Sequence, residues 1–318
     1  MTAPAVAPLP LTVLVTTRDE EVNIGRTLAS VAGRVDQVFV LDSESSDRTV
    51  EIARRCADEV VNLPYEHGRI IPWIFQWGLD HLPIRNDWVL ILEADQALTS
   101  ELAAELGELF AAPEAIRFDG FYIRRKQIFR GRPIRFGGYG GKHLLKLFRR
   151  SKGQLDPLEQ DTRVYVDGPV GRLRAPLEEW NRKEDSILFY LEKHLRYAEA
   201  FAREELERRR TGAAWKAEPR LFGTPDQRVL WLKRIYNRSP RYLRAGGYFF
   251  YRYFLRLGIL DGREGFVFHF LQAFWFRLVV DVRLEELLRE EREAGRREAE
   301  AAPAPASEPA PTAEGAER

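Results

Sequence analysis

Cysteine and histidine are scarce in this sequence. Its 318 residues include one cysteine, Cys56, and five histidines. A single cysteine excludes an intrachain disulfide framework and a metal site built from several thiolates, and it is typical of a protein kept in a reducing compartment. Metal sites built from imidazoles are limited in the same way, because His67, His143 and His194 have no ligand-like spacing.

An excess of charge of either sign is also lacking. There are 49 Lys and Arg residues against 48 Asp and Glu residues, which gives a formal net charge of +1. This balance argues against a strongly basic nucleic-acid-binding protein and against an acidic solvating protein. With 45% hydrophobic and 31% charged residues, the composition is that of a globular protein long enough for a substantial core.

No stretch reaches the ~18 consecutive apolar residues expected of a membrane-spanning helix. The longest strongly apolar segment without charge covers twelve residues, 265–276. The first ten residues contain three prolines and no Lys or Arg ahead of an apolar run, unlike a secretory signal. We therefore expect a cytoplasmic protein.

What the sequence does contain is a series of short apolar runs separated by amphipathic stretches. Residues 11–17, 37–41 and 88–92 are continuous runs of the kind found in strands buried on both faces of a parallel sheet. Between the first two runs, Ile24 and Leu28 recur at helical spacing with Val31. The alternation predicts an α/β fold with a doubly wound, mostly parallel sheet.

The remainder of the chain changes character twice. Residues 120–166 read as further strands and hairpins that cap one side of the sheet, and residues 178–210 as a charged helix. One face of that helix is expected to consist of Leu188, Leu191, Leu195 and Ala198. The expected organisation is a flexible N-terminus (1–10), an α/β domain (11–175), a helical region (176–292) and a disordered Ala/Pro/Glu tail (293–318).

Two carboxylates follow the third expected strand. In L-E-A-D-Q, Glu93 and Asp95 lie two residues apart, and alternate side chains of an extended backbone share a face. Both can therefore converge on one divalent ion, and hard oxygen ligands suit Mg²⁺ or Mn²⁺, which bridge substrate phosphates. The alternative is a helix-entry loop whose acids face solvent, because acid-x-acid pairs at strand ends are common.

The loops after the first two strands also carry polar side chains. Asp42 ends the second strand, where its carboxylate could accept hydrogen bonds from a nucleobase or ribose, or make a local turn. In T-T-R-D-E-E-V-N-I, Arg18 could stack on a base or pair with phosphate, whereas Glu20 and Glu21 could merely favour a helix N-terminus.

Taken together, these loops resemble those of family 2 glycosyltransferases. The segments T-T-R-D-E-E-V-N-I-G-R-T-L-A-S-V, V-F-V-L-D-S-E-S-S-D-R-T and W-V-L-I-L-E-A-D-Q occur in the family's order and at its spacing. The likeness continues through F-Y-I-R-R-K-Q-I-F-R-G-R-P-I-R-F-G-G-Y and L-G-I-L-D-G-R-E-G-F, and looks closest to bacterial members that build lipopolysaccharide cores or other surface glycans. It implies a Rossmann-like GT-A fold, a nucleotide-sugar donor, a divalent ion and inversion at the anomeric carbon.

The resemblance also implies roles for individual residues. Thr16, Arg18 and Glu20 fall in the first nucleotide-contact loop. Asp42 matches the acid that contacts the base or ribose, and Asp95 matches the acid that holds metal and diphosphate.

Two positions depart from the family pattern. The family usually has Asp where this chain has Glu93, and Asn where it has Asp19. Glu93 can still ligate Mg²⁺ or Mn²⁺ beside Asp95, although its side chain is longer.

The catalytic base is expected to be a carboxylate that follows the metal motif and precedes a strand. An inverting transfer needs such a base to deprotonate the acceptor hydroxyl as it attacks. Alignment of V-Y-V-D-G with the family's corresponding strand places Asp161 at this acid, with Glu159 as the second candidate. Thr162 and Arg163 stand where relatives tend to carry Glu and His, and the alternative is that Asp161 is an ordinary loop carboxylate.

The C-terminal third combines basic and aromatic residues. Residues 228–260 contain eight Lys and Arg and no acids, and residues 241–276 hold thirteen of the 37 aromatic residues. Aromatic rings with interleaved Arg are typical of helices in a membrane interface, where Arg reaches anionic headgroups. The same pattern also fits packing on the catalytic domain or a second subunit, and single-stranded nucleic acid fits it least.

The hypothesis is an inverting, metal-dependent glycosyltransferase that is peripheral on the cytoplasmic face of a bacterial inner membrane. Its partners are a nucleotide-sugar donor and a lipid-linked or glycan acceptor, with no nucleic acid. Two other classes stay open: a non-catalytic nucleotide-sugar or lipid-binding module, and a nucleotidyltransferase. The latter is disfavoured because the early chain lacks a glycine-rich phosphate loop with Lys or Arg.

Overall fold

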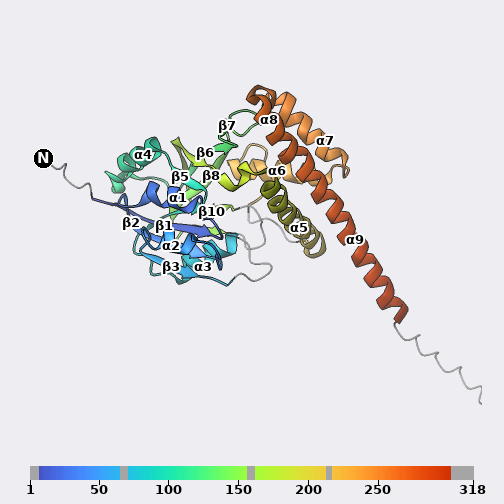
Figure 1. Ribbon diagram of the computed structural model, residues 1–318, viewed down its shortest axis with the longest axis horizontal. Coiled ribbons are helices and arrows are strands. Elements are labelled where there is room, and N and C mark those ends of the chain that lie inside the picture. Colours follow the sequence, from blue (N-terminus) through green and yellow to red (C-terminus); the bar gives the residue numbers. More distant parts are fainter. Residues whose placement is uncertain (1–6, 65–70, 156–161, 213–216, 302–318) are drawn as a thin grey trace, which may run out of the picture.

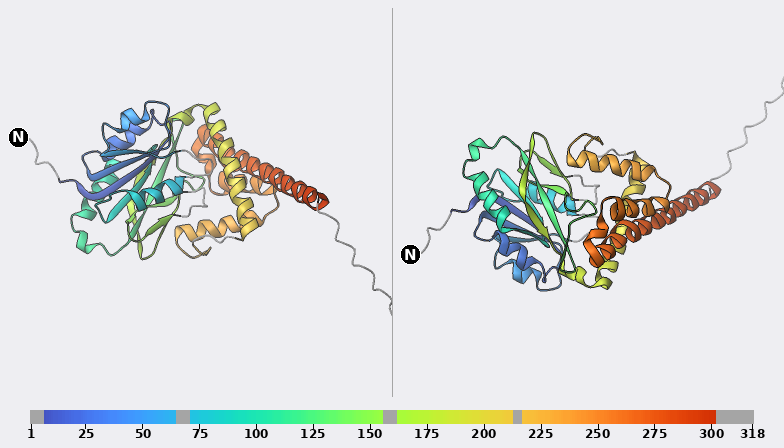
Figure 2. Two further views of the ribbon diagram at one scale, coloured as in Figure 1. Left: turned by 90° about the horizontal axis from the view of Figure 1, so that it is seen from below. Right: turned by 90° about the horizontal axis from the view of Figure 1, so that it is seen from above.

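The computed structural model describes residues 7–64, 71–155, 162–212 and 217–301. An α/β layered domain lies at the N-terminal end of the molecule, and a group of helices lies at its other side (Figures 1 and 2). The last helix leaves this group and projects away from the sheet (Figure 1).

Within the described residues, nine strands form one mixed sheet, in the order β3-β2-β1-β4-β8-β6-β11-β5 with β7 beside β6. The pairs β1–β2, β1–β4, β2–β3 and β6–β11 are parallel, and β9 and β10 form a separate antiparallel pair. The strand bounds are β1 (Leu9–Thr17), β2 (Val35–Asp42), β3 (Glu59–Asn62), β4 (Trp88–Glu93), β5 (Gln96–Leu98), β6 (Gly120–Phe129), β7 (Arg132–Ile134), β8 (His143–Arg149), β9 (Gly153–Leu155), β10 (Val164–Val166) and β11 (Val170–Glu179).

Helices flank both faces of the sheet and then form the C-terminal region. The α-helices are α1 (Ile24–Val31), α2 (Thr49–Ala53), α3 (Ile71–His81), α4 (Ser100–Phe110), α5 (Ile187–Thr211), α6 (Pro225–Arg238), α7 (Leu243–Phe250), α8 (Gly262–His269) and α9 (Phe276–Ala301). Short 3₁₀ turns are η1 (Pro113–Ala115), η2 (Arg182–Asp185) and η4 (Gly258–Asp261), and π-helical turns are η3 (Tyr251–Leu255) and η5 (Phe270–Trp275).

The continuous apolar runs form strands because both faces of the sheet are covered. In β1, Val13 and Val15 pack in one core with α1 and α4, while Leu14 packs with α3 in a second core on the opposite face. Alternate residues therefore all need to be apolar. The expected doubly wound architecture is confirmed, and β6 and β8 extend the central sheet itself, where the sequence suggested strands that cap one side.

The long charged helix begins later than expected and buries a different face. Strand β11 continues to Glu179, and α5 starts only at Ile187. Ser186 is the N-cap of this helix, because its side chain accepts a hydrogen bond from the Phe189 backbone N–H. The expected face of Leu188, Leu191, Leu195 and Ala198 is wrong, because Leu188 is 75% exposed and Leu195 50% exposed. The buried row is instead Tyr190, His194, Ala198 and Ala202, a four-residue ridge in which small residues allow close approach.

The helical region is built on contact between α5 and α9. Ala198 and Ala202 pack against Phe276, Val280 and Leu284 of α9. α5 and α9 therefore lie side by side (Figure 1). α9 continues to Ala301, beyond the boundary at residue 292 that composition suggested.

Hydrogen bonds to the turn after β7 join the helical region to the sheet. Both carboxylate oxygens of Asp261 accept backbone N–H groups, from Arg135 and Phe136, each at 2.9 Å. Next to them, Gly137 has φ of +62°, and an added Cβ would lie 2.0 Å from the His269 ring. The turn after β7 therefore requires glycine both for its backbone conformation and for contact with α8.

Among the described residues, one helical stretch has the length and composition of a membrane span. Residues Gly258–Arg297 are helical and contain an 18-residue segment with mean hydropathy of 1.3, of which 44% is buried within the protein. No uninterrupted apolar run of that length occurs in the sequence. Core helices of globular proteins share these properties, so length and composition alone do not make it a span.

Candidate active site

Acidic residues from separate strands meet at one edge of the sheet. Because β1 is parallel to both β2 and β4, their carboxyl ends lie together: Thr16 pairs with Glu93, and Thr17 pairs with Asp42. Asp95 follows Glu93 by two residues at the same edge. The expected convergence of Asp42 and Asp95 on one end of the sheet is therefore present in the structure.

Asp95 has a carboxylate oxygen that none of the described residues satisfies. Its Oδ1 is buried and has no hydrogen-bond partner among them, while its main-chain carbonyl accepts the Trp180 N–H at 3.0 Å and Arg26 at 2.5 Å. Burial raises the pKa of the Asp95 carboxyl well above its usual value, and the nearby negative charge of Glu179 adds to this effect. The carboxyl is held where a cation or a donor group would stabilise it.

Glu93 is the centre of a partly buried polar cluster. Its Oε1 lies 3.1 Å from Nζ of Lys146, a side chain with no exposed surface, and accepts Gln96 Nε2 at 3.3 Å. The same Gln96 nitrogen donates to Glu179 at 2.8 Å, and Glu179 pairs with Arg125 at 3.0 Å. Sequence reasoning missed Lys146, Glu179 and Arg125. Lys146 could have been found, because a single lysine inside the apolar run H-L-L-K-L-F indicates a buried charge that needs a partner.

Asp95 and Glu93 supply only part of the coordination that a divalent ion needs. The unsatisfied oxygen of Asp95 is a suitable hard ligand, whereas Oε1 of Glu93 is already engaged by Lys146 and Gln96. No group of three or more His, Cys, Asp or Glu side chains among the described residues is placed to hold a metal. An ion here would need oxygens from a ligand and from water to complete its coordination, which is common for Mg²⁺.

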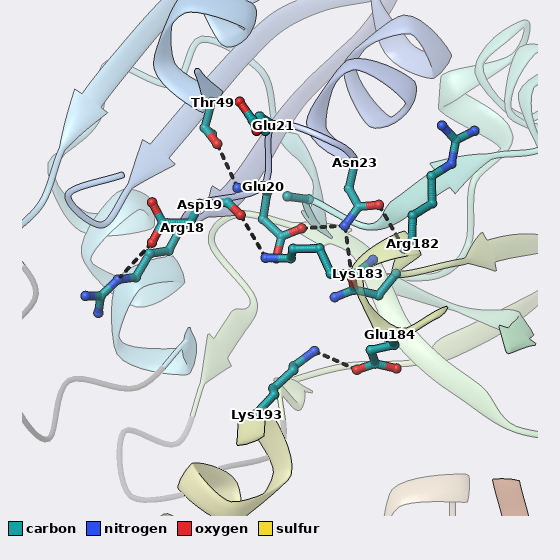
Figure 3. A network of polar contacts seen from close by, with 12 residues as sticks. Arg18, Asp19, Glu20, Glu21, Asn23, Thr49, Arg182, Lys183, Glu184 and Lys193 are labelled. Carbon is teal, nitrogen blue, oxygen red and sulfur yellow. Dashed lines mark hydrogen bonds and ion pairs between the residues drawn. The ribbon is translucent and has the colours of Figure 1, made fainter. Parts of the chain in front are cut away.

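Glu20 holds the first loop in place through contacts with Lys183 and Asn23, as Figure 3 shows. Oε1 of Glu20 lies 2.6 Å from Nζ of Lys183, and Oε2 accepts Asn23 Nδ2 at 2.6 Å. Lys183 also donates to the main-chain carbonyl of Asp19 at 2.8 Å, which ties this loop to η2. Glu20 thus shapes the loop, while half-exposed Arg18 lies 4.0 Å from the Asp19 carboxylate.

The second loop is ordered by Asp42. Although only 1% of this residue is exposed, both carboxylate oxygens accept bonds from Ser45: Oδ2 from its backbone N–H at 2.9 Å and Oδ1 from its hydroxyl at 2.5 Å. This is the local turn that the sequence left open as an alternative. Thr16, which is 5% exposed, lies at the junction of the loops, and its carbonyl accepts the Ala94 N–H at 3.1 Å.

Helix α5 contributes a cation that sequence reasoning did not single out. Lys193 lies on the side of α5 that faces the loops, where its Nζ donates to Glu184 Oε1 at 2.9 Å (Figure 3). Its positive charge acts on Asp95 and opposes the rise in the pKa of that carboxyl. α5 therefore brings a positive charge to the acids at this edge of the sheet.

The expected base lies outside the described residues. Neither Asp161 nor the second candidate Glu159 falls in the described ranges, which resume at residue 162. The strand that follows is anchored, because buried Arg163 pairs with Asp226 of α6 at 2.9 Å and Tyr122 donates to the same carboxylate at 2.6 Å.

A sequence model described as "Glycosyl transferase family 2" matches residues 12–180, more than half of the chain. The chain belongs to glycosyltransferase family 2. The matched segment contains all three strand-end loops, and the mixed sheet with helices on both faces is the GT-A fold of this family. In this glycosyltransferase, the helices α5 to α9 follow residue 180 and lie outside the segment that the family model matches.

Curated relatives support the same assignment over a shorter stretch. An uncharacterized glycosyltransferase of Rickettsia typhi is 31% identical over 121 residues, which are 38% of this chain and 40% of the relative. A TPR repeat-containing protein of Synechococcus elongatus is 33% identical over 138 residues, covering 37% of this chain and 31% of that protein. The match to this glycosyltransferase thus spans less than half the length of these relatives.

Solved structures resemble this glycosyltransferase more distantly. TarS 1-349 of Staphylococcus aureus is 15% identical, with 88% of this chain and 91% of that chain covered and a TM-score of 0.38. Glucosyl-3-phosphoglycerate synthase of Mycobacterium tuberculosis, solved with Mn²⁺, UDP and glucosyl-3-phosphoglycerate, is 17% identical, with 65% and 82% covered and a TM-score of 0.38.

Proposed function

We propose that this glycosyltransferase moves a sugar, with inversion, from a nucleoside-diphosphate donor to a hydroxyl of a lipid-linked or lipopolysaccharide-type glycan. The observation that carries the proposal is the convergence of Asp42, Glu93 and Asp95 at the carboxyl ends of adjacent parallel strands. In open α/β sheets, ligands bind beyond these ends. Membership in the family supplies the class of reaction.

Each residue has a distinct role in this proposal. Thr16, Arg18, Glu20 and Asp42 form the loops that place the nucleotide, with Glu20 acting through the loop that it braces. Asp95, with Glu93 beside it, holds Mg²⁺ or Mn²⁺, and a bound ion would offset the charge that develops on the departing diphosphate. Asp161 deprotonates the acceptor hydroxyl.

A donor screen tests this function. We expect one nucleotide sugar, together with Mn²⁺, to raise the melting temperature of the protein, and we expect its transfer or hydrolysis to stop when a chelator removes the ion. The variant Asp161→Asn should bind the donor and fail to transfer it. Equal rates with and without chelator would refute the metal role, and donor binding without turnover over a panel of glycan acceptors would favour the non-catalytic alternative.

An exposed apolar surface supports the membrane part of the proposal. We name it the apolar tip: Leu243, Phe250, Tyr251, Phe254, Leu255, Leu257, Ile259, Leu260, Phe266 and Phe270 are all exposed. They lie on α7, α8 and the turns between them, and at the start of η5, near the end of α9 that is nearer the sheet (Figure 1). Exposed Arg256 and Arg263 lie among them and suit anionic headgroups.

The apolar tip is joined directly to the catalytic domain. The backbone N–H of Gly137 donates to the carbonyl of Arg256 at 2.9 Å, and Asp261 accepts the neighbouring N–H groups of Arg135 and Phe136. A tip seated in the cytoplasmic leaflet would keep the sheet edge near the membrane surface. This placement favours an acceptor carried on a lipid.

Substitutions in the apolar tip should abolish membrane binding without unfolding the protein. Leu255 and Leu260 are 64% and 59% exposed, so Leu255→Glu with Leu260→Glu removes little from the core. Burial of a leucine in lipid contributes about 1.5–3 kcal/mol, so loss of two corresponds to roughly 100-fold weaker binding or more. Flotation with phosphatidylglycerol-containing liposomes at low salt measures this. Leu188→Glu on α5 is the matched control, and wild-type protein that stays unbound would contradict membrane association.

A further inference from the structure

Lys193 lies beside the acidic cluster but belongs to a helix outside the matched family segment. It is seven residues after the Ser186 cap of α5, on the side that faces the first loop and η2 (Figure 3). Its side chain is 19% exposed. The ring of Tyr197, one turn further along α5, has its centroid 5.4 Å from Nζ of Lys193.

The ammonium of Lys193 keeps unused hydrogen-bonding capacity. Among the described residues it donates to Glu184 alone, at 2.9 Å, although an ammonium has three N–H donors. Other cations of the site are more fully committed: Lys183 binds Glu20 and the Asp19 carbonyl, and Lys146 pairs with Glu93 without any exposed surface. Lys193 therefore combines a partly exposed side chain with two N–H donors that no described residue accepts.

Three acids of the site already have cations beside them: Glu20 pairs with Lys183, Glu93 with Lys146 and Glu179 with Arg125. The positive charge of Lys193 acts on the fourth, Asp95, from α5. Burial acts to lower the pKa of Lys193. The neighbouring Tyr197, Glu184 and Asp95 side chains outweigh burial and hold that pKa well above its usual value, so the ammonium stays charged.

We propose that Lys193 contacts the donor diphosphate directly, from the α5 side of the site opposite the strand-end acids. The inference rests on the proposed function and adds a phosphate-binding residue from the helical region. An ammonium with two N–H donors that no described residue accepts, on a side chain that is partly exposed, suits phosphate oxygens, and such charge-assisted bonds are among the stronger ones in proteins. α5 thereby contributes substrate contact as well as structure.

The test uses nucleotides in the absence of divalent ion. Binding of UDP, GDP, ADP and CDP to the full chain is measured by calorimetry in chelator, together with the nucleoside of whichever diphosphate binds. Lys193→Gln should weaken diphosphate binding by about 10- to 100-fold, Lys193→Arg should retain most of it, and nucleoside binding should not change. Arg196→Gln is the matched control, because Arg196 is exposed on the same helix and pairs with Glu192.

The outcomes separate this inference from the proposed function. If the wild type binds a diphosphate and Lys193→Gln binds it equally well, the contact does not exist while the proposed function stands. If diphosphate and nucleoside weaken together, Lys193 has only a structural role, and the inference is again overturned. If the wild type binds no nucleotide with or without Mn²⁺, the proposed function itself fails.

Discussion

Asp95→Asn is expected to lower sugar transfer by about 10²- to 10³-fold while leaving the protein at least as thermally stable as the wild type. The amide keeps the size of the side chain and removes its charge. Because burial and Glu179 raise the pKa of the Asp95 carboxyl, its ionised form is disfavoured in the folded protein, and a neutral group relieves that repulsion. Loss of activity with unchanged or higher stability is typical of a functional residue.

Initial rates of transfer and the melting temperature of the same preparations measure both effects. Asp87→Asn is the matched control, since this carboxylate precedes β4 at the opposite edge of the sheet and is 87% exposed. A variant at Asp95 that transfers sugar at the wild-type rate would remove this residue from the active site. A marked fall in melting temperature would instead assign it a structural role.

Arg244→Met is expected to lower the free energy of unfolding by about 3–5 kcal/mol. Arg244 Nε donates to Asp281 Oδ1 at 2.7 Å, and the two side chains are 1% and 0% exposed. The guanidinium also reaches Glu205 at 3.3 Å, so this group joins α7, α9 and α5. Its removal leaves the Asp281 charge buried without its partner, which costs more than the pair itself contributes.

Urea unfolding monitored by circular dichroism measures this effect. The double variant Arg244→Met, Asp281→Asn should recover part of the lost stability, because it removes the unpaired charge while keeping an acceptor for the Tyr242 backbone N–H. Arg289→Met is the control on α9, where an exposed pair with Glu285 should contribute little. Equal stability of Arg244→Met and the wild type would show that the pair does not hold the helical region together.

The sheet of the catalytic domain was predictable because each of its buried strands is marked by a short apolar run in the sequence. Val13, Leu14 and Val15 are all apolar, and only a strand covered on both faces buries all three. The acids that end β2 and β4 were predictable for the same reason, since parallel strands bring their carboxyl ends to one edge. The fold and the location of the candidate site followed from these two patterns.

The buried face of α5 was not predictable in this way. Its leucines suggested one face, yet Leu188 and Leu195 are exposed and the ridge of Ala198 and Ala202 is buried. The partner of that ridge is α9, which begins at Phe276 and lies far along the chain. Small residues mark close helix packing only when the second helix is known.

The sequence by itself determined a doubly wound sheet, the family to which the chain belongs and the edge at which Asp42, Glu93 and Asp95 collect. Only the tertiary structure decided that Lys146 pairs with Glu93, that Gln96 links Glu93 to the Glu179–Arg125 pair, and that the charge of Lys193 on α5 acts on Asp95. The reason is physical. Strand pattern depends on neighbours in sequence, whereas the partners of a buried charge are set by whichever distant segments fold against it.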